Sequence, residues 1–140
     1  MANIAIVFWS GTGNTEAMAN AVADGARAKG ADVALLSPAD FNADQVAQYD
    51  AIAFGCPAMG DEVLEEDEFQ PMFDAVLPAL SGKKIALFGS YGWGDGEWMR
   101  NWEETCKEAG AALAADPLIV NEEPDDDGVA KCRALGEAIA

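Results

Sequence analysis

Short apolar segments alternate along this chain with segments of helical periodicity, and this alternation limits the folds open to it. Each apolar segment is almost continuous, as in strands covered on both faces, and each is too short to span a bilayer. We expect strands at residues 3–9, 32–37, 51–55, 84–90 and 118–120. We expect helices at residues 14–29, 65–80, 97–109 and 126–140, with a short helical turn at 43–48. The pattern predicts an α/β fold, in which helices cover both faces of a five-stranded parallel sheet.

The loops after the first, third and fourth expected strands contain most of the chemically distinctive residues. These loops are residues 10–15, 56–62 and 90–96. In a parallel sheet the carboxyl ends of the strands meet at one edge, which is where ligands bind in open α/β sheets. The sequence therefore predicts one site that is assembled from three distant segments.

Charge and cysteine content limit the partners and the compartment. The chain has 25 acidic and 8 basic residues, a net charge of −17, which makes nucleic acids and anionic membranes poor partners. Its three cysteines (Cys56, Cys106, Cys132) form no CxxC pair and it has no histidine, which argues against a metal site or a disulfide scaffold. No secretory signal is apparent. We expect a single domain over residues 1–140 that is cytoplasmic and monomeric.

The loop between the first strand and the first helix predicts a cradle for an anion. N–H groups at a helix start, together with the helix dipole, favour negative charge. The candidate ligands are Ser10, Gly11, Thr12, Gly13, Asn14 and Thr15. No lysine follows Gly13, as a nucleoside triphosphate loop requires, and Glu16 occupies the place of the third glycine of a dinucleotide fingerprint. We expect one monophosphate, held by hydroxyls and N–H groups; a glycine-rich turn without a ligand is the alternative.

The loop after the fourth strand places aromatic side chains between glycines. Its candidate site residues are Ser90, Tyr91, Gly92, Trp93, Gly94 and Asp95. Glycine permits close backbone approach, so we expect the Trp93 ring to stack on a flat ligand. Tyr91 could do the same, and packing of Trp93 into the core is the alternative. Trp98 and Trp102, one helical turn apart, predict a packing stripe with Cys106.

The loop after the third strand supplies the remaining part of the predicted site. Its candidate residues are Pro57, Ala58, Met59, Gly60, Asp61 and Glu62. The polarisable Met59 side chain suits a flat π-surface. Gly60 allows a peptide to change orientation, and Glu62 can accept a hydrogen bond from a ring N–H. The absence of a histidine to activate it argues against Cys56 as a nucleophile.

These three loops resemble the flavin-binding segments of the flavodoxin family, in particular of its short-chain, clostridial type. The segment Phe-Trp-Ser-Gly-Thr-Gly-Asn-Thr-Glu at residues 8–16 is similar to the family's FMN-phosphate signature. Residues 57–62 and 89–96 are similar to its two flavin loops, and the resemblance covers essentially the whole chain. It implies a flavodoxin-like three-layer sandwich with strand order 2-1-3-4-5, and FMN as the cofactor.

The resemblance also implies a role for each loop. The phosphate would be held by Ser10, Thr12, Asn14 and Thr15 with the amides of Gly11 and Gly13. Trp93 and Met59 would cover the two faces of the isoalloxazine. Glu62 would accept the ring N3–H, and the Gly60 carbonyl would turn toward flavin N5 in the semiquinone. Ser90, Gly92 and the neighbouring backbone would contact the ring edge and the ribityl chain.

A function follows from the same resemblance. It implies a low-potential one-electron carrier, not an enzyme, that cycles between semiquinone and hydroquinone and shuttles electrons between redox enzymes in place of ferredoxin. Acids cluster from Asp61 to Glu68, from Asp95 to Glu108 and within residues 122–127. We expect these acids to form a solvated surface, and the first two clusters would also steer basic-surfaced redox proteins. The alternative is a small FMN-dependent NAD(P)H or quinone reductase, against which the net charge and the missing dinucleotide loop argue.

Overall fold

The computed structural model describes residues 2–11, 13–59, 63–92 and 94–140 of the 140-residue chain. Its strands are β1 (Asn3–Phe8), β2 (Asp32–Leu36), β3 (Ala51–Gly55), β4 (Lys84–Tyr91), β5 (Ala112–Leu113) and β6 (Leu118–Asn121). They form one sheet in the order β2-β1-β3-β4, with β5 and β6 both beside β4 and every pairing parallel. The predicted fold class and strand order are confirmed, with the fifth position shared by two short segments.

The split of the fifth strand is a feature that the sequence analysis did not predict. β5 pairs with the beginning of β4, and β6 pairs with its end. Backbone N–H groups of Ala112 and Ala114 donate to the carbonyls of Lys83 and Ile85, which places β5 in the sheet. β5 has only two residues, which is too short for an apolar pattern in the sequence. It is recognised as a strand only by its pairing with β4.

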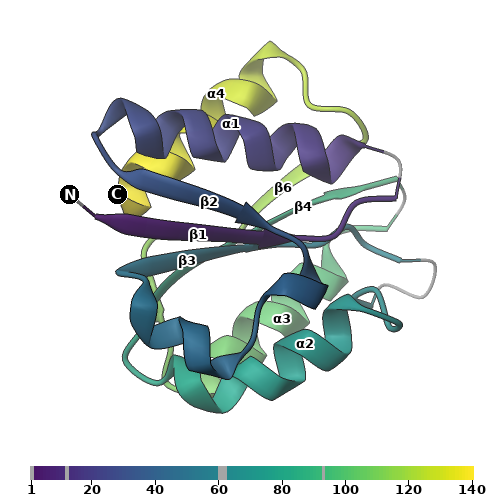
Figure 1. Cartoon of the computed structure of the whole chain (residues 1–140). Coiled ribbons are helices and arrows are strands. Elements are labelled where there is room, and N and C mark those ends of the chain that lie inside the picture. The colour runs from purple at the N-terminus through teal and green to yellow at the C-terminus, as the bar shows by residue number, and fades with distance from the viewer. Residues whose placement is uncertain (1, 12, 60–62, 93) are drawn as a thin grey trace.

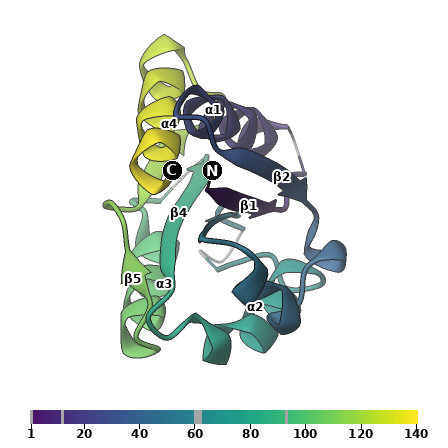
Figure 2. The same ribbon diagram turned by 60° about the vertical axis from the view of Figure 1, so that its left-hand side comes forward.

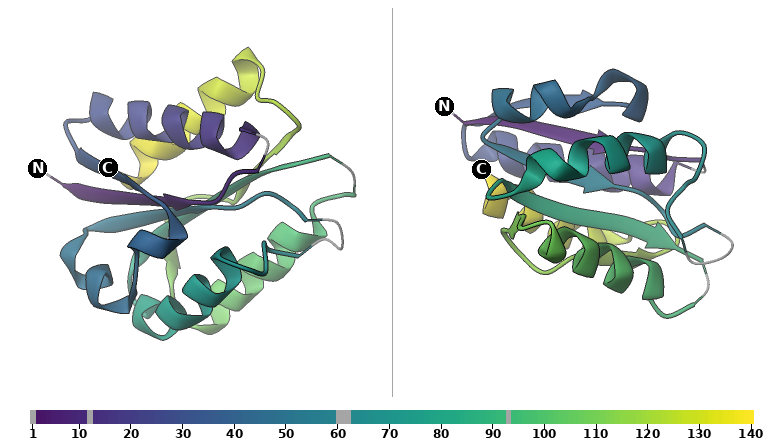
Figure 3. Two further views of the ribbon diagram at one scale, coloured as in Figure 1. Left: turned by 45° about the vertical axis from the view of Figure 1, so that its right-hand side comes forward. Right: turned by 90° about the horizontal axis from the view of Figure 1, so that it is seen from below.

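Four helices cover the sheet in two layers in the described part of the chain. They are α1 (Asn14–Ala28), α2 (Phe69–Val76), α3 (Glu97–Glu108) and α4 (Asp126–Ile139). Figure 1 shows α1 and α4 on one face of the sheet and α2 and α3 on the other, and the turned views in Figures 2 and 3 agree. This arrangement is the predicted three-layer sandwich. None of these helices is long and apolar enough to cross a membrane.

The two layers of core differ in the size of their side chains. Successive strand residues face opposite layers, so that Ala5 and Val7 contact the α2–α3 side while Ile4 and Ile6 contact the α1–α4 side. The α2–α3 side buries the large rings of Phe41, Phe54, Phe69, Phe73, Trp98 and Trp102. The α1–α4 side is built mainly from small residues, among them Ala19, Ala21, Ala23, Ala26, Ala51, Ala53 and Ala86.

The second helix is shorter than the predicted range of residues 65–80. It begins at Phe69, because the chain before it forms a capping turn around the Glu65 side chain. Pro71 stands in the first turn, where a missing N–H costs nothing. At its other end the helix tightens into the 3₁₀ turn η3 (Leu77–Leu80), since Pro78 has no N–H to continue the α-helical pattern.

Two further short turns connect β2 to β3. They are the 3₁₀ turns η1 (Pro38–Asp40) and η2 (Ala43–Gln48). The second confirms the helical turn expected at residues 43–48. It begins with a capping box, in which the Asn42 side chain accepts the Asp44 N–H and the Gln45 side chain accepts the Asn42 N–H.

Candidate functional site

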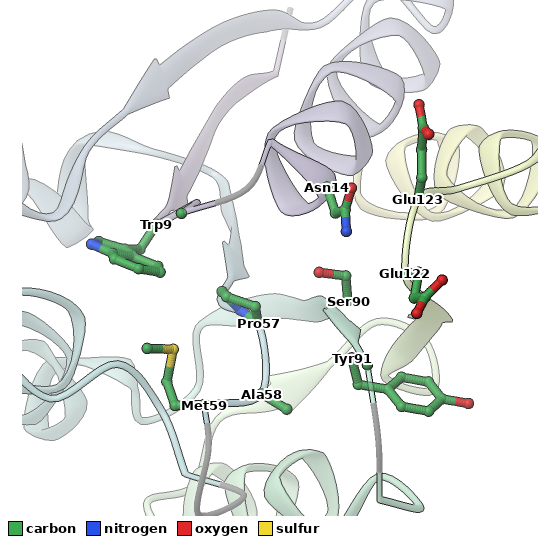
Figure 4. Close-up of a pocket in the computed structure, with 11 residues that line it drawn as sticks. Trp9, Asn14, Pro57, Ala58, Met59, Ser90, Tyr91, Glu122 and Glu123 are labelled. Atoms are coloured by element: carbon green, nitrogen blue, oxygen red, sulfur yellow. The ribbon is translucent and has the colours of Figure 1, made fainter.

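A cavity of about 540 Å³ opens at the carboxyl edge of the sheet, and Figure 4 shows the side chains around it. Three of the segments that line it belong to the loops singled out from the sequence, and a fourth follows β6. The lining residues are Trp9, Gly11, Asn14, Pro57, Ala58, Met59, Ser90, Tyr91, Gly92, Glu122 and Glu123. The predicted convergence of the three loops is therefore observed.

Backbone hydrogen bonds hold these loops in place where they leave the sheet. The Trp9 N–H donates to the Gly55 carbonyl at 3.0 Å, which extends the β1–β3 pairing into the first loop. The Ala58 N–H donates to the Ser90 carbonyl, also at 3.0 Å, and joins the loop after β3 to the end of β4. The cavity wall is thus a continuation of the sheet and not a set of independent loops.

The loop before α1 is folded around one hydroxyl oxygen. The Oγ atom of Ser10 accepts the N–H groups of Gly13 at 3.1 Å and Glu16 at 3.2 Å. Gly13 has a φ of 95°, which glycine adopts without strain and which turns the chain into the helix. The hydroxyl hydrogen of Ser10 can still be donated to a ligand. The helix start therefore carries the N–H groups and dipole that an anion cradle requires.

A pair of buried hydroxyls connects this cradle to the loop after β4. The Oγ1 atom of Thr15 lies 3.0 Å from the Oγ atom of Ser90, and both side chains are buried. Ser90 also lines the cavity, whereas Thr15 is not among its lining residues. Direct contact of Thr15 with a phosphate stays a prediction, but its link to the other half of the site is present in the fold.

Trp9 is a site residue that the sequence analysis did not single out. Its Nε1 atom donates to the Glu68 carboxylate at 2.7 Å, and its indole lies so close to Gly11 that an added Cβ there would stand 3.0 Å from Cη2. A side chain at position 11 would therefore crowd the ring, which would have to shift. The available signal was its position: Trp9 ends the first expected strand, at the sheet edge where ligands bind.

The lower wall of the cavity is apolar and rests on a buried tryptophan. Pro57, Ala58 and Met59 line it, and Figure 4 shows the Met59 side chain extending toward Trp9. Beneath them the Trp98 indole N–H donates to the Cys56 carbonyl at 3.2 Å. The predicted packing stripe of the helix that contains Trp98 is confirmed, because Trp98, Trp102 and Cys106 are all buried.

The chemistry of Cys56 fits a structural role. The thiol is fully buried, and burial raises its pKa to about 12. The Glu65 N–H donates to its sulfur at 3.4 Å. A neutral thiol in this setting is a poor nucleophile. Cys56 thus ties the beginning of its loop to Glu65, in the turn before α2.

Glu65 anchors the far end of the same loop. Its carboxylate is buried and accepts three backbone N–H groups, from Asp67, Glu68 and Phe69, at 2.7–2.9 Å. Burial alone would raise the pKa of this carboxyl, but the three N–H groups together hold it below its ordinary value of 4.5. The same turn positions Glu68, the partner of Trp9. Glu65 belongs to the first acidic cluster, which was expected to be a solvated surface, but this carboxylate is buried and structural.

Two predicted residues of the loop after β4 have their side chains outside the cavity centre. The Tyr91 ring packs on Trp98 with centroids 5.8 Å apart, and Figure 4 shows it extending away from Ser90 and Pro57. Asp95 lines a separate cavity of about 140 Å³. Its carboxylate meets the Arg100 guanidinium at 3.0 Å, and this hydrogen bond and charge lower the pKa of Asp95.

The predicted site residues fall into three groups. Those that line the cavity are Gly11, Asn14, Pro57, Ala58, Met59, Ser90, Tyr91 and Gly92. Those that belong to the same loops without lining it are Ser10, Gly13, Thr15, Gly94 and Asp95. Those that lie outside the described residues are Thr12, Gly60, Asp61, Glu62 and Trp93. Their roles toward a ligand stay predictions.

Glu122 and Glu123 complete the lining and were not predicted as site residues. The sequence analysis counted them only as part of an acidic cluster. They follow β6, the strand at the fifth position, so the rule that ligands bind at the carboxyl edge would also have indicated them. The lining of the cavity, as far as the structure describes it, includes no lysine or arginine.

The donor set of the cavity fits FMN. A helix N-terminus with N–H groups, a hydroxyl and an amide suits one phosphate without a cation, and the apolar wall suits a flat ring. The cavity volume is within the range of about 300–1,000 Å³ that is usual for such ligands. The geometry and the chemistry of the site are therefore consistent with the resemblance.

Comparison with known proteins gives the same answer for the whole chain. Residues 6–136 match the family model described as flavodoxin. The chain is 50% identical over 135 residues to the flavodoxin of Clostridium beijerinckii, which covers 96% of this chain and 97% of that one. It is also 50% identical over 137 residues to the flavodoxin of Megasphaera elsdenii, covering 98% of each chain.

Solved structures agree with the sequence relatives. The solution structure of two-electron reduced Megasphaera elsdenii flavodoxin superimposes with a TM-score of 0.90 over 97% of both chains. Oxidised flavodoxin 1 from Bacillus cereus, at 31% identity, gives a TM-score of 0.86 over 99% of this chain and 97% of that one. The chain belongs to the flavodoxin family and, like its 50% identical relatives, is an FMN electron carrier and not an enzyme.

Proposed function

We propose that this protein is a low-potential one-electron carrier whose FMN lies in the 540 Å³ cavity, with its phosphate at residues 10–15 and its ring between residues 57–62 and 90–95. One observation supports this placement above the others: the cradle and the apolar wall face one cavity at the sheet edge. Bound FMN supplies the one-electron chemistry. The protein binds and orients the cofactor, shields it from water, and sets its potentials through nearby charge.

The proposed binding mode separates the tasks of the cavity residues. Asn14 and the N–H groups at the start of α1 hold the phosphate, with Ser10 as a further donor. Pro57, Ala58 and Met59 exclude water from one side of the ring. The carboxylates of Glu122 and Glu123, and of Asp61 and Glu62 in the undescribed segment, oppose added negative charge on the ring. This opposition lowers the second reduction potential more than the first.

Titration of the apoprotein with FMN and with riboflavin tests the placement of the phosphate. We expect FMN to bind one to one and riboflavin, which lacks the phosphate, to bind at least about 100-fold more weakly, as the loss of several charge-assisted hydrogen bonds predicts. Equal affinities for the two flavins would contradict a phosphate site at residues 10–15.

Two experiments test the one-electron function: potentiometric titration of the flavoprotein, and measurement of its rate of NAD(P)H oxidation. We expect two well-separated one-electron potentials, and replacing Gly60 with alanine should narrow the separation. We also expect the flavoprotein alone to oxidise NAD(P)H slowly or not at all. Turnover with NAD(P)H at catalytic rates would instead support the reductase alternative.

The finer features of the partners and the setting are also proposals. Glu66, Asp67 and Glu68 are exposed in the turn before α2, and Glu97 and Glu104 are exposed on α3. We expect these acids to steer basic-surfaced redox proteins, so that transfer rates fall as salt rises. A rate that does not depend on salt would contradict the steering. The three buried free cysteines suit a reducing compartment, and we propose a cytoplasmic monomer formed by one domain over residues 1–140.

A further inference from the structure

A second cavity lies beside the proposed FMN cavity, at the end of the edge strand β2. Its volume is about 370 Å³, within the range of about 300–1,000 Å³ that is usual for binding sites. The two cavities share one lining residue, Trp9. Most of the second cavity is apolar, lined by Phe8, Trp9, Leu35, Leu36, Pro38 and Ala39. A surface of this kind can bury the apolar part of a ligand.

Two carboxylates belong to the same cavity. Glu16 lies in the first turn of α1 and Glu68 lies directly before α2, so the fold brings them to one cavity from distant segments. Both residues are exposed, and neither forms an ion pair with a described residue. No lysine or arginine is among the described residues that line the cavity. The cavity therefore combines apolar surface with uncompensated negative charge.

A hydrogen bond holds one of these carboxylates at the wall. The Nε1 atom of Trp9 donates to Oε2 of Glu68 at 2.7 Å, and an ionised carboxylate has about four acceptor positions, so Glu68 can accept further hydrogen bonds. Figure 4 shows the indole nitrogen of Trp9 directed away from Asn14 and Ser90. Glu68 is not among the residues that line the FMN cavity. Its charge is thus available to a ligand other than the cofactor.

Apolar surface beside unpaired carboxylates suits an amphipathic cation. Lysine and arginine side chains bury an apolar stem while the charged head stays at a polar rim. A guanidinium can also pair with carboxylates through two hydrogen bonds and stack on an aromatic ring such as that of Trp9. A neutral apolar ligand would leave both carboxylates without partners, and an anion would be repelled.

The surroundings of the cavity indicate the source of this cation. Glu68 continues the exposed acidic turn that contains Glu66 and Asp67, which would attract a basic protein surface. We propose that the cavity docks a basic side chain, arginine or lysine, that a redox partner protein presents. The redox role of this partner rests on the proposed function, whereas the cavity itself does not depend on FMN.

Titration with a side-chain probe tests the site. The probe is N-acetylarginine amide, whose only charge is the guanidinium, and the control is N-acetylcitrulline amide, which has a similar shape without the charge. The Trp9 indole N–H signal in NMR spectra reports binding, at constant ionic strength, with and without FMN. We expect a dissociation constant on the order of 1 mM for the arginine probe, and at least about tenfold weaker binding of the citrulline probe. Equal binding of the two probes, or an unmoved Trp9 signal, would overturn the proposal.

Two pairs of variants locate the bound probe. Ala39→Phe adds a ring at the cavity wall, and its control Ala47→Phe adds the same ring at an exposed position of η2 outside the cavity. Glu16→Gln removes an acid of the cavity, and its control Glu137→Gln removes an exposed acid of α4. We expect Ala39→Phe and Glu16→Gln to bind the arginine probe at least about tenfold more weakly than their controls do. Equal affinities within either pair would overturn the proposed site.

Electron transfer to a basic protein separates partner docking from binding of a small molecule. Ala39→Phe and Ala47→Phe leave the net charge unchanged, so long-range steering is the same in both. We expect the reduced Ala39→Phe protein to transfer electrons to a lysine-rich c-type cytochrome at least about threefold more slowly than Ala47→Phe at low salt. Equal rates, with the probe still bound, would assign the cavity to a free cationic compound and overturn docking. If the protein did not bind FMN, the proposed function would fail, and the probe titration of the apoprotein would still decide the cavity.

Discussion

The two faces of the sheet are packed by opposite means. On the α1–α4 face, glycines bring the helices into backbone contact: a Cβ added to Gly25 would lie 2.0 Å from the Arg133 carbonyl oxygen, and one added to Gly136 would lie 2.0 Å from that of Val22. On the α2–α3 face, rings fill the space, with Phe73 in edge contact with Phe54 and with the indole of Trp102.

This difference extends to the functional site. The start of α1, which is the proposed phosphate site, belongs to the closely packed face, while Pro57–Met59 and their supporting turn rest on the aromatic face. An added methyl group on the α1–α4 face would collide with helix backbone. A ring removed from the α2–α3 face would leave a cavity. We therefore expect the two faces to fail in different ways when they are changed.

Removal of a ring from the aromatic face is expected to have the largest effect. Phe73 is 1% exposed and contacts three other aromatic residues. Phe73→Ala should lower the free energy of unfolding of the apoprotein by about 3–5 kcal/mol, because it loses buried area and leaves a cavity. Urea denaturation measures this, with Phe73→Leu as the milder control. A loss below about 1 kcal/mol would show that this face can collapse onto the gap.

Addition of a methyl group to the small-residue face should come next. Gly136→Ala should cost about 1–3 kcal/mol, because α1 and α4 must separate, even though alanine favours a helix by about 1 kcal/mol. Gly128→Ala in the same helix is the control, since its nearest contact would be 3.3 Å away at a proline side chain. Similar urea midpoints for the two variants would contradict the backbone contact.

Replacement of Glu65 tests how far the aromatic side of the sheet supports the loop at residues 56–62. Glu65→Gln should cost about 1–2 kcal/mol at neutral pH, because the amide cannot accept all three N–H groups. The pKa of Glu65 is lowered in the folded protein, so its contribution is present above pH 4.5 and is lost as the pH falls through the folded value. The difference between Glu65→Gln and the unmodified protein should thus shrink below pH 4.5. Glu66→Gln, at the exposed neighbouring position, is the control and should change the free energy of unfolding at neutral pH by less than about 0.5 kcal/mol.

Removal of the hydrogen bond between Thr15 and Ser90 should have the smallest effect on the free energy of unfolding. Thr15→Val keeps the shape but removes the hydrogen bond to Ser90, at a cost of about 1 kcal/mol. We also expect weaker FMN binding, because the cradle loses its tie to the loop after β4. Thr105→Val, which removes an exposed hydroxyl on α3, is the control for both measurements. Equal urea midpoints and equal FMN affinities for the two variants would contradict this tie.

Much of the site could be predicted from sequence, since it depends on local pattern. The glycine–hydroxyl loop at residues 10–15 and the loops after β3 and β4 follow apolar strands, and parallel topology brings such loops together. β5 and the contact of Trp9 with Glu68 were missed because each depends on a partner far along the chain, whereas Glu122 and Glu123 were counted only as part of an acidic cluster. No local spacing indicates that Trp9 donates to Glu68 or that Ala112 pairs beside β4.

The sequence by itself determined the fold class and, through family resemblance, the strand order, and it predicted an anion cradle at residues 10–15, because apolar periodicity and glycine placement act within a few residues. Only the tertiary structure decided which acids are structural and which line the cavity. Glu65 turns inward to cap α2, and Glu122 is held in a left-handed turn against the Tyr91 carbonyl. Both are glutamates in acidic clusters, and they differ only in the N–H and carbonyl groups that the fold places beside them.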